Sequence, residues 1–141
     1  MHIDRQRIEH YLYDIKKNTI ELEDLLNKYT DDALFQDPYI IKAVKYILIE
    51  IAEATANTLQ HILAKNLGQP VSGYMDTLLK AKENGILTEG LFFSLNPFFK
   101  FRHALVHRYW ITDDALLLKN LRSGYRDFYT FIEQIERKIG S

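Results

Sequence analysis

Apolar residues recur at steps of three and four along most of this chain, which is the spacing of one face of an α-helix. The first such stripe has seven members between positions 8 and 29: Ile8, Leu12, Ile15, Thr19, Leu22, Leu26 and Tyr29. Charged side chains occupy the opposite face, and the helix is expected to begin near Asp4. The stripe predicts a long first helix that packs against another long helix.

A second helix is predicted from residue 37 to residue 67. Asp37 is suited to cap its start, Pro38 fits the first turn, and Gly68 fits the C-terminal cap. At about 30 residues this helix would be roughly 45 Å long. It is apolar on more than one face over 39–56, so we expect it to be central and covered in part by a second subunit.

Two carboxylates, Glu50 and Glu53, interrupt this apolar surface. One interpretation places them at the edge of the helix or in pairs with a lysine or arginine. The other places one of them at a cleft of a dimer interface, where it holds a catalytic side chain. The pattern of residues leaves both open.

Three further helical segments are predicted in the second half of the chain. A loop over 69–73 precedes a short helix with Tyr74, Met75, Leu78 and Leu79 inward, which ends at Asn84-Gly85. Thr88 begins a fourth helix that Pro97 is expected to kink or restart. Residues 112–114 cap the last helix, whose stripe runs from Leu117 to Ile139. The chain therefore reads as a single all-α domain over 1–141, an up-and-down bundle of about five helices.

Composition narrows the class of protein. The 141 residues include no cysteine, which excludes a disulfide framework, a thiol nucleophile and a cysteine-based zinc site. With a net charge of −1, the protein does not have the generally basic surface of many nucleic-acid-binding proteins. Any contact with nucleic acid must therefore use a local basic patch. No apolar run reaches membrane-spanning length, and no secretory signal is apparent, so a cytoplasmic protein without a membrane partner is expected.

The segment 101–110 carries the candidate chemistry. Two arginines, two histidines and a tyrosine (Arg102, His103, His107, Arg108 and Tyr109) crowd into a stretch that otherwise reads as buried helix. Histidine can exchange protons near neutral pH, and the arginine fork matches phosphate oxygens. Together they suit RNA cleavage without a metal, in which the 2′-hydroxyl attacks its own phosphate and arginine stabilises the added negative charge.

Other uses of these side chains remain open. The spacing of His103 and His107 would suit two ligands of one metal, but a third ligand is not evident, and we expect no metal or other cofactor. The cluster could also be structural. An ideal helix separates Arg102 and His107 by about 140°. They meet only if the helix is distorted, if the arginine curls round, or if a second chain completes the site. For His2, His10 and His61 a structural or surface role is favoured.

The segment resembles the motif of the HEPN superfamily and, within it, the HepT-like toxin branch. The matching residues are Arg102-His103-Ala104-Leu105-Val106-His107-Arg108-Tyr109. The long second helix, the 68–74 loop, the 84–87 turn and the acidic cap after Trp110 fall in the family's order, so the resemblance covers nearly the whole chain. The position after the arginine is most often asparagine in this branch and is His103 here, which leaves open whether His103 shares in proton transfer.

The resemblance implies a homodimeric, metal-independent endoribonuclease toxin with a cleft between two motif helices. His107 would be the general base or acid, and Arg102 would position and stabilise the scissile phosphate of an RNA, tRNA among the candidates. Lys100, His103 and Arg108 would make the cleft basic.

It also implies a partner, the minimal nucleotidyltransferase antitoxin MntA, which would transfer AMP from ATP to Tyr109. The added bulk and negative charge would then block RNA. The alternative is a non-catalytic HEPN helical binding partner of a nucleotidyltransferase.

Overall fold

The computed structural model describes residues 3–68, 70–107 and 113–140, which form seven α-helices and no strand. The helices are α1 (Arg5–Lys28), α2 (Asp31–Gln36), α3 (Pro38–Leu67), α4 (Gly73–Glu83), α5 (Glu89–Val106), α6 (Asp114–Gly124) and α7 (Arg126–Gly140). The all-α prediction is confirmed, but the described part of the chain has two more helices than predicted. A short α2 stands between the first two long helices, and the last helix is divided at Tyr125.

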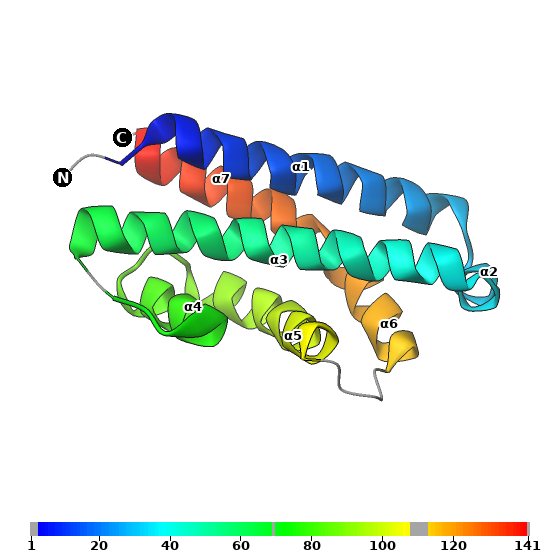
Figure 1. Ribbon diagram of the computed structural model, residues 1–141. Helices are drawn as coiled ribbons and strands as arrows, with labels where there is room; N and C mark the ends of the chain where they lie inside the picture. The colour runs from blue at the N-terminus through cyan, green and yellow to red at the C-terminus, as the bar shows by residue number, and fades with distance from the viewer. Residues whose placement is uncertain (1–2, 69, 108–112, 141) are drawn as a thin grey trace.

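The long helix α3 lies in the middle of the bundle (Figure 1). On one side it packs along α1, which also contacts α7, and on the other side it packs against α4 and α5. The helices α1 and α3 run in opposite directions and are joined through α2 at one end of the bundle. This arrangement leaves the C-terminal end of α5 beside both α3 and α4, where the site is built.

The predicted stripe of α1 is buried against this core. Asp4 caps the helix by accepting a hydrogen bond from the Arg7 N–H at 3.1 Å. The stripe also includes Asn18, which is 6% exposed and was not predicted. Its amide donates to the Asp14 carbonyl at 2.9 Å and to the Glu50 carboxylate at 3.3 Å. Asn18 therefore ties α1 to α3 through a buried polar contact.

Both predicted ends of α3 are confirmed. The Asp37 carboxylate accepts hydrogen bonds from the backbone N–H groups of Tyr39 at 2.9 Å and Ile40 at 3.2 Å, and Pro38 occupies the first turn. Gly68 ends the helix with a φ of 59°, a left-handed conformation that glycine adopts without a Cβ penalty. These caps satisfy backbone groups that the helix leaves open, so the sequence specifies both bounds.

The structure corrects two expectations for the second half of the chain, that Pro97 could restart the helix and that Met75 and Leu79 face inward. The helix α5 runs through Pro97 without interruption, because the buried Leu95, Phe98 and Phe99 hold it on the core around the proline. On α4, Leu78 is buried as predicted, whereas Met75 and Leu79 are about two-fifths exposed. One stripe of this short helix faces the core, and these two side chains lie outside it.

The chain divides into α6 and α7 where α5 packs closely against it. A Cβ at Gly124 would lie only 3.1 Å from the Phe98 ring, and the rings of Phe98 and Phe128 have centroids 5.0 Å apart. The spacing of the apolar stripe continues across the division, which is why the sequence pattern predicted one helix. Asp113 caps α6 by accepting from the Leu116 N–H, as expected.

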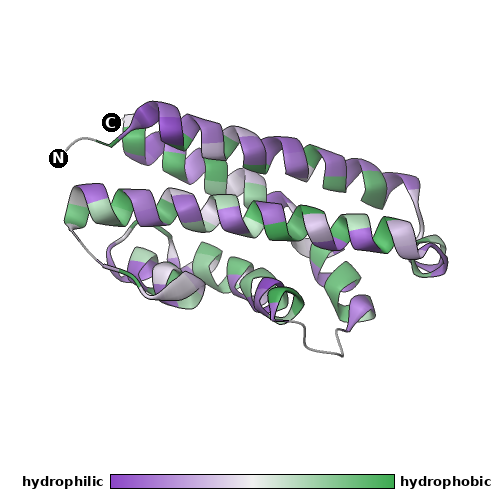
Figure 2. Cartoon of the chain, viewed as in Figure 1, coloured by the Kyte–Doolittle hydropathy of each residue, from purple (hydrophilic) through white to green (hydrophobic). Residues whose placement is uncertain are grey.

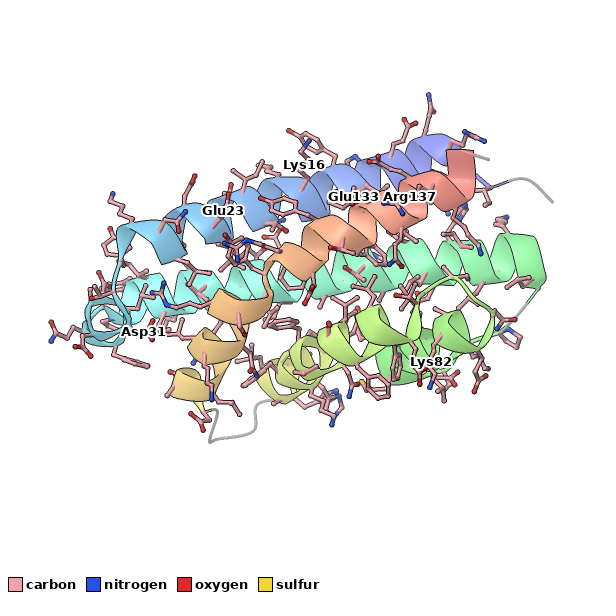
Figure 3. All side chains as sticks on the ribbon, turned by 180° about the vertical axis from the view of Figure 1, so that it is seen from behind. Lys16, Glu23, Asp31, Lys82, Glu133 and Arg137 are labelled. Atoms are coloured by element: carbon pink, nitrogen blue, oxygen red, sulfur yellow. The ribbon has the colours of Figure 1, made fainter. Side chains whose placement is uncertain are left out.

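Hydrophilic and hydrophobic residues alternate along each helix in Figure 2, and the core is formed mainly by the buried apolar positions. Figure 3 shows charged side chains along the outer surfaces of α1 and α7, among them Glu133 and Arg137, which form an exposed pair at 3.5 Å. Over the ranges that the structure describes, no helix is both long and apolar enough to cross a membrane.

Candidate active site

Arg102 lies in the last turns of α5, and two other helices hold its guanidinium. The guanidinium carbon lies 3.8 Å from the centre of the Tyr74 ring, on α4. Its Nη2 lies 3.6 Å from the Glu53 carboxylate, on α3. The side chain is only 12% exposed, and its Nε is buried without a hydrogen-bond partner. An arginine is thus drawn into the bundle, where burial of an unpaired donor carries a cost.

Tyr74 sits in the first turn of α4 and packs edge-to-face on Phe99 at 6.3 Å between ring centroids. Burial raises the pKa of the Tyr74 phenol, the nearby Arg102 charge opposes that rise, and the Glu53 charge adds to it. A tyrosine with a raised pKa is a neutral phenol at physiological pH. Its ring therefore meets Arg102 as an uncharged aromatic face, which suits a cation–π contact.

The loop before Tyr74 is fixed by polar contacts. The Ser72 N–H donates to the Asp76 carboxylate at 2.8 Å, and Lys80 bridges Asp76 at 3.2 Å and the Pro70 carbonyl at 2.6 Å. The Ser72 N–H is the main cause of a lowered pKa of Asp76, and Lys80 adds to it. These contacts hold the turn that carries Tyr74, and so fix the position of its ring next to Arg102.

His103 and His107 face each other at the end of α5. Their ring centroids are 4.2 Å apart, with 45° between the ring planes. The helix ends at Val106, and the backbone N–H of His107 donates to the His103 carbonyl at 3.0 Å. Both histidines are exposed, so they are accessible to a ligand from solvent.

A pocket of about 410 Å³ joins these groups. It is lined by Ser72, Gly73, Tyr74, Met75, Phe99, Arg102, His103 and His107. Arg102 and His107 therefore reach the same pocket from a single chain, although an ideal helix would place them far apart in angle. The pocket combines cationic and proton-transferring groups with the apolar surface of Met75 and Phe99.

Glu53 and Glu50 have different surroundings, although they lie three residues apart on α3. Glu53 pairs with an arginine, as the first interpretation expected, and that arginine is the candidate catalytic residue Arg102. Glu50 instead accepts a hydrogen bond from Asn18. Its charge is the main cause of a raised pKa of the exposed Tyr46 phenol, and a hydrogen bond between the two adds to the rise.

Of the other predicted site residues, the structure describes only Lys100. Lys100 lines a separate pocket of about 290 Å³ between α5 and α6, with Pro97, Phe101, Ala104, Asp113, Leu116 and Asn120. Arg108 and Tyr109 lie outside the described residues, as does His2.

The two other histidines that the structure describes, His10 and His61, have a surface and a structural role, as expected. His61 is 7% exposed, and its Nε2 accepts a hydrogen bond from the Asp4 N–H at 3.0 Å. His10 is exposed and lies 3.7 Å from Asp14. Within residues 3–68, 70–107 and 113–140, no three histidine, aspartate or glutamate side chains are grouped so that they could hold a metal.

Sequence reasoning missed Tyr74 as a site residue, because its apolar ring was assigned to the core. For Glu53 the sequence left two interpretations open, an edge or paired carboxylate and a carboxylate that holds a catalytic side chain, and it did not identify Arg102 as the partner. A signal was present in the sequence only for Glu53, because an acidic residue on a long apolar helix needs a partner. That Arg102 contacts both Glu53 and Tyr74 could not be predicted without knowing how α3, α4 and α5 pack.

The protein is thus an all-α bundle in which an arginine and two histidines line one pocket. These side chains suit a protein that acts on a phosphate ester. The profile of the family described as "Ribonuclease HepT-like" matches residues 15–135. The chain belongs to this HepT-like family. A search of curated proteins found no significant match.

Solved structures share the fold over nearly their whole length. A toxin–antitoxin with AMP-PNP has a TM-score of 0.81 at 21% identity, covering 92% of this chain and 97% of its own. A mutant of the toxin–antitoxin MntA–HpeT has a TM-score of 0.82 at 20% identity, covering 93% and 98%. YutE from Bacillus subtilis, a cytosolic protein of unknown function, has a TM-score of 0.81 at 19% identity, covering 99% and 95%. At these identities the likeness shows the fold.

Proposed function

We propose that this protein is the toxin of a toxin–antitoxin system and acts as a metal-independent endoribonuclease in the cytoplasm. The observation that carries the proposal is the single pocket lined by Arg102, His103 and His107. Membership of the HepT-like ribonuclease family supports it, as do neighbours that are toxin–antitoxin structures.

The reaction that these groups suit is attack of an RNA 2′-hydroxyl on the adjacent phosphorus. His107 accepts the proton of the hydroxyl, and Arg102 stabilises the negative charge that builds up on the phosphate oxygens. The bond to the 5′-oxygen breaks, and that oxygen takes up a proton from water, which balances the proton that His107 removed from the 2′-hydroxyl. The products are a 2′,3′-cyclic phosphate and a 5′-hydroxyl end. His103, whose ring lies next to that of His107, adds to phosphate binding.

The proposed control is AMP transfer to Tyr109 by an MntA-like nucleotidyltransferase antitoxin. The phenolic oxygen attacks the α-phosphate of ATP, pyrophosphate leaves, and the phenol proton is released. Tyr109 follows His107 by two residues in the sequence, so the AMP group would add bulk and negative charge next to the proposed general base. An RNA phosphate would then be excluded sterically and repelled.

We further propose a homodimer formed through α3 and α5. Large apolar side chains are exposed on both helices: Tyr39 and Tyr46 on α3 are 81% and 63% exposed, and Val106 on α5 is 42% exposed. Their burial by a second copy would remove apolar surface from water. Two copies of the site, with Lys100 and Arg108 contributing charge, would give a basic cleft on a nearly neutral protein.

The test is cleavage of total cellular RNA by the purified protein, followed by identification of the RNA ends. Cyclic phosphate and 5′-hydroxyl ends are expected. If the unmodified protein cuts neither total RNA nor purified tRNA, the endoribonuclease proposal is wrong, and the protein is better described as a non-catalytic partner of a nucleotidyltransferase.

A further inference from the structure

We propose that Glu53 and Tyr74 are positioning residues that hold the Arg102 guanidinium in the orientation required by the scissile phosphate. The proposal rests on the proposed function, since it assigns a role for that reaction. Neither residue belongs to the motif segment, and each comes from a different helix, α3 and α4.

The geometry restricts Arg102 on three sides. The Tyr74 ring covers one face of the guanidinium at 3.8 Å, the Glu53 carboxylate lies 3.6 Å from Nη2, and the protein buries Nε. The buried Nε is closed to a ligand, so an incoming phosphate must bind through the Nη nitrogens. The direction from which the phosphate is bound is therefore set before RNA arrives, which is the preorganisation that charge stabilisation needs.

An arginine at the end of a helix would otherwise be free to adopt many rotamers. Ordering its long side chain costs conformational entropy, and if this happened only when RNA binds, the activation free energy of cleavage would be higher. Because the contacts with α3 and α4 already order Arg102 in the folded protein, this entropy is lost during folding. The site is thereby coupled to the packing of three helices.

Glu53 also has an opposing effect. Its negative charge lies close to the place where phosphate would bind, so by charge alone it should weaken RNA binding. A positioning role and a purely electrostatic one therefore predict opposite results for Glu53→Gln. Positioning predicts a lower kcat with KM unchanged or lowered. A counter-charge that only weakens binding predicts a higher kcat/KM.

Tyr74 offers a second, independent variant pair. If the ring face is what holds Arg102, Tyr74→Phe keeps the contact and Tyr74→Leu removes it, because the contact is made with the aromatic ring. Glu50→Gln is the matched control for Glu53→Gln. It makes the same chemical change three residues earlier on α3, where the carboxylate contacts Asn18 and not Arg102.

The experiment measures kcat and KM for an RNA that the wild type cleaves, with urea unfolding to establish that each variant is folded. Glu53→Gln and Tyr74→Leu should lower kcat about 10- to 100-fold without raising KM. Tyr74→Phe and Glu50→Gln should stay within about threefold of wild type. A rise in kcat/KM for Glu53→Gln, equal kcat for Tyr74→Leu and wild type, or equal losses in Glu50→Gln and Glu53→Gln would overturn the proposal.

A second measurement does not depend on cleavage. The ¹⁵N order parameter of the Arg102 Nε–H should be high in wild type, Tyr74→Phe and Glu50→Gln, and clearly lower in Glu53→Gln and Tyr74→Leu. Unchanged order in both of the latter variants would refute positioning even if RNA is cut. Absence of cleavage by the wild type would refute the proposed function whatever the order parameter shows.

Discussion

Arg122 should be among the most important surface-accessible side chains for stability. From α6 its guanidinium donates to three acceptors at the corner between α1 and α2: the Asp31 carboxylate at 2.5 Å, the Leu26 carbonyl at 2.7 Å and the Tyr29 carbonyl at 2.8 Å. The two carbonyls belong to the end of α1, where helical partners are lacking. Arg122→Met keeps the apolar stem and removes all three hydrogen bonds.

The expected loss follows from these contacts. A hydrogen bond to a charged group contributes about 1.5–3 kcal/mol, but the Arg122 side chain is 34% exposed and water can replace part of each bond. At about 1 kcal/mol for each bond, the free energy of unfolding should fall by about 3 kcal/mol. For a chain of this size that corresponds to a Tm lower by about 10 °C.

Urea unfolding of Arg122→Met beside Arg137→Met is the appropriate assay. Arg137 is 77% exposed and pairs with Glu133 one turn earlier on its own helix, so its replacement should cost less than about 0.5 kcal/mol. Hydrogen exchange should also be faster over residues 26–36 in the Arg122 variant. A loss below about 1 kcal/mol, or one equal to that of Arg137→Met, would refute the reasoning.

Three further predictions concern titration and the proposed chemistry. Burial first, and then the Arg7 charge, lower the pKa of His61, so the unfolded chain takes up this proton at a higher pH than the folded one. Stability should therefore fall as pH drops below about 6.5. The fall should be smaller in His61→Gln, whose side-chain oxygen can still accept from Asp4, and parallel urea midpoints from pH 7.5 to 5.5 would contradict this. Arg102→Lys keeps the charge but loses the planar guanidinium and its contact with the Tyr74 ring, so kcat should fall about 100-fold. Activity within threefold of wild type would mean that only the positive charge of Arg102 is needed. Tyr109→Phe should cleave RNA normally but escape neutralisation by the antitoxin with ATP, whereas loss of cleavage would assign Tyr109 a direct role in catalysis or folding.

The parts of the fold that the sequence predicted well have local causes. Asp4, Asp37 and Gly68 act on backbone groups a few residues away, so their effect is visible in the sequence. The course of α5 through Pro97 depends on packing, because tertiary contacts outweigh the lost backbone hydrogen bond there. The short helix α2 was missed because its Thr30 cap and single buried Leu34 make too weak a pattern.

The candidate site was predicted in part for the same reason. Arg102, His103 and His107 lie within one turn or two of each other, so their sequence spacing already indicates shared chemistry. Tyr74 and Glu53 are distant in the sequence and reach Arg102 only through the packing of α4 and α3 on α5. Sequence spacing carries no information on such contacts, and the structure was needed to find them.

The central claim is tested most directly by RNA cleavage with EDTA present, comparing wild type, His107→Ala and His10→Ala. His10 is an exposed histidine on α1 outside the pocket, so its replacement controls for loss of any imidazole. The protein must be made without antitoxin and shown by intact mass to carry no AMP. We predict that wild type and His10→Ala cleave RNA and leave cyclic phosphate ends, while folded His107→Ala does not. Equal cleavage by His107→Ala, or none by unmodified wild type, would contradict the account.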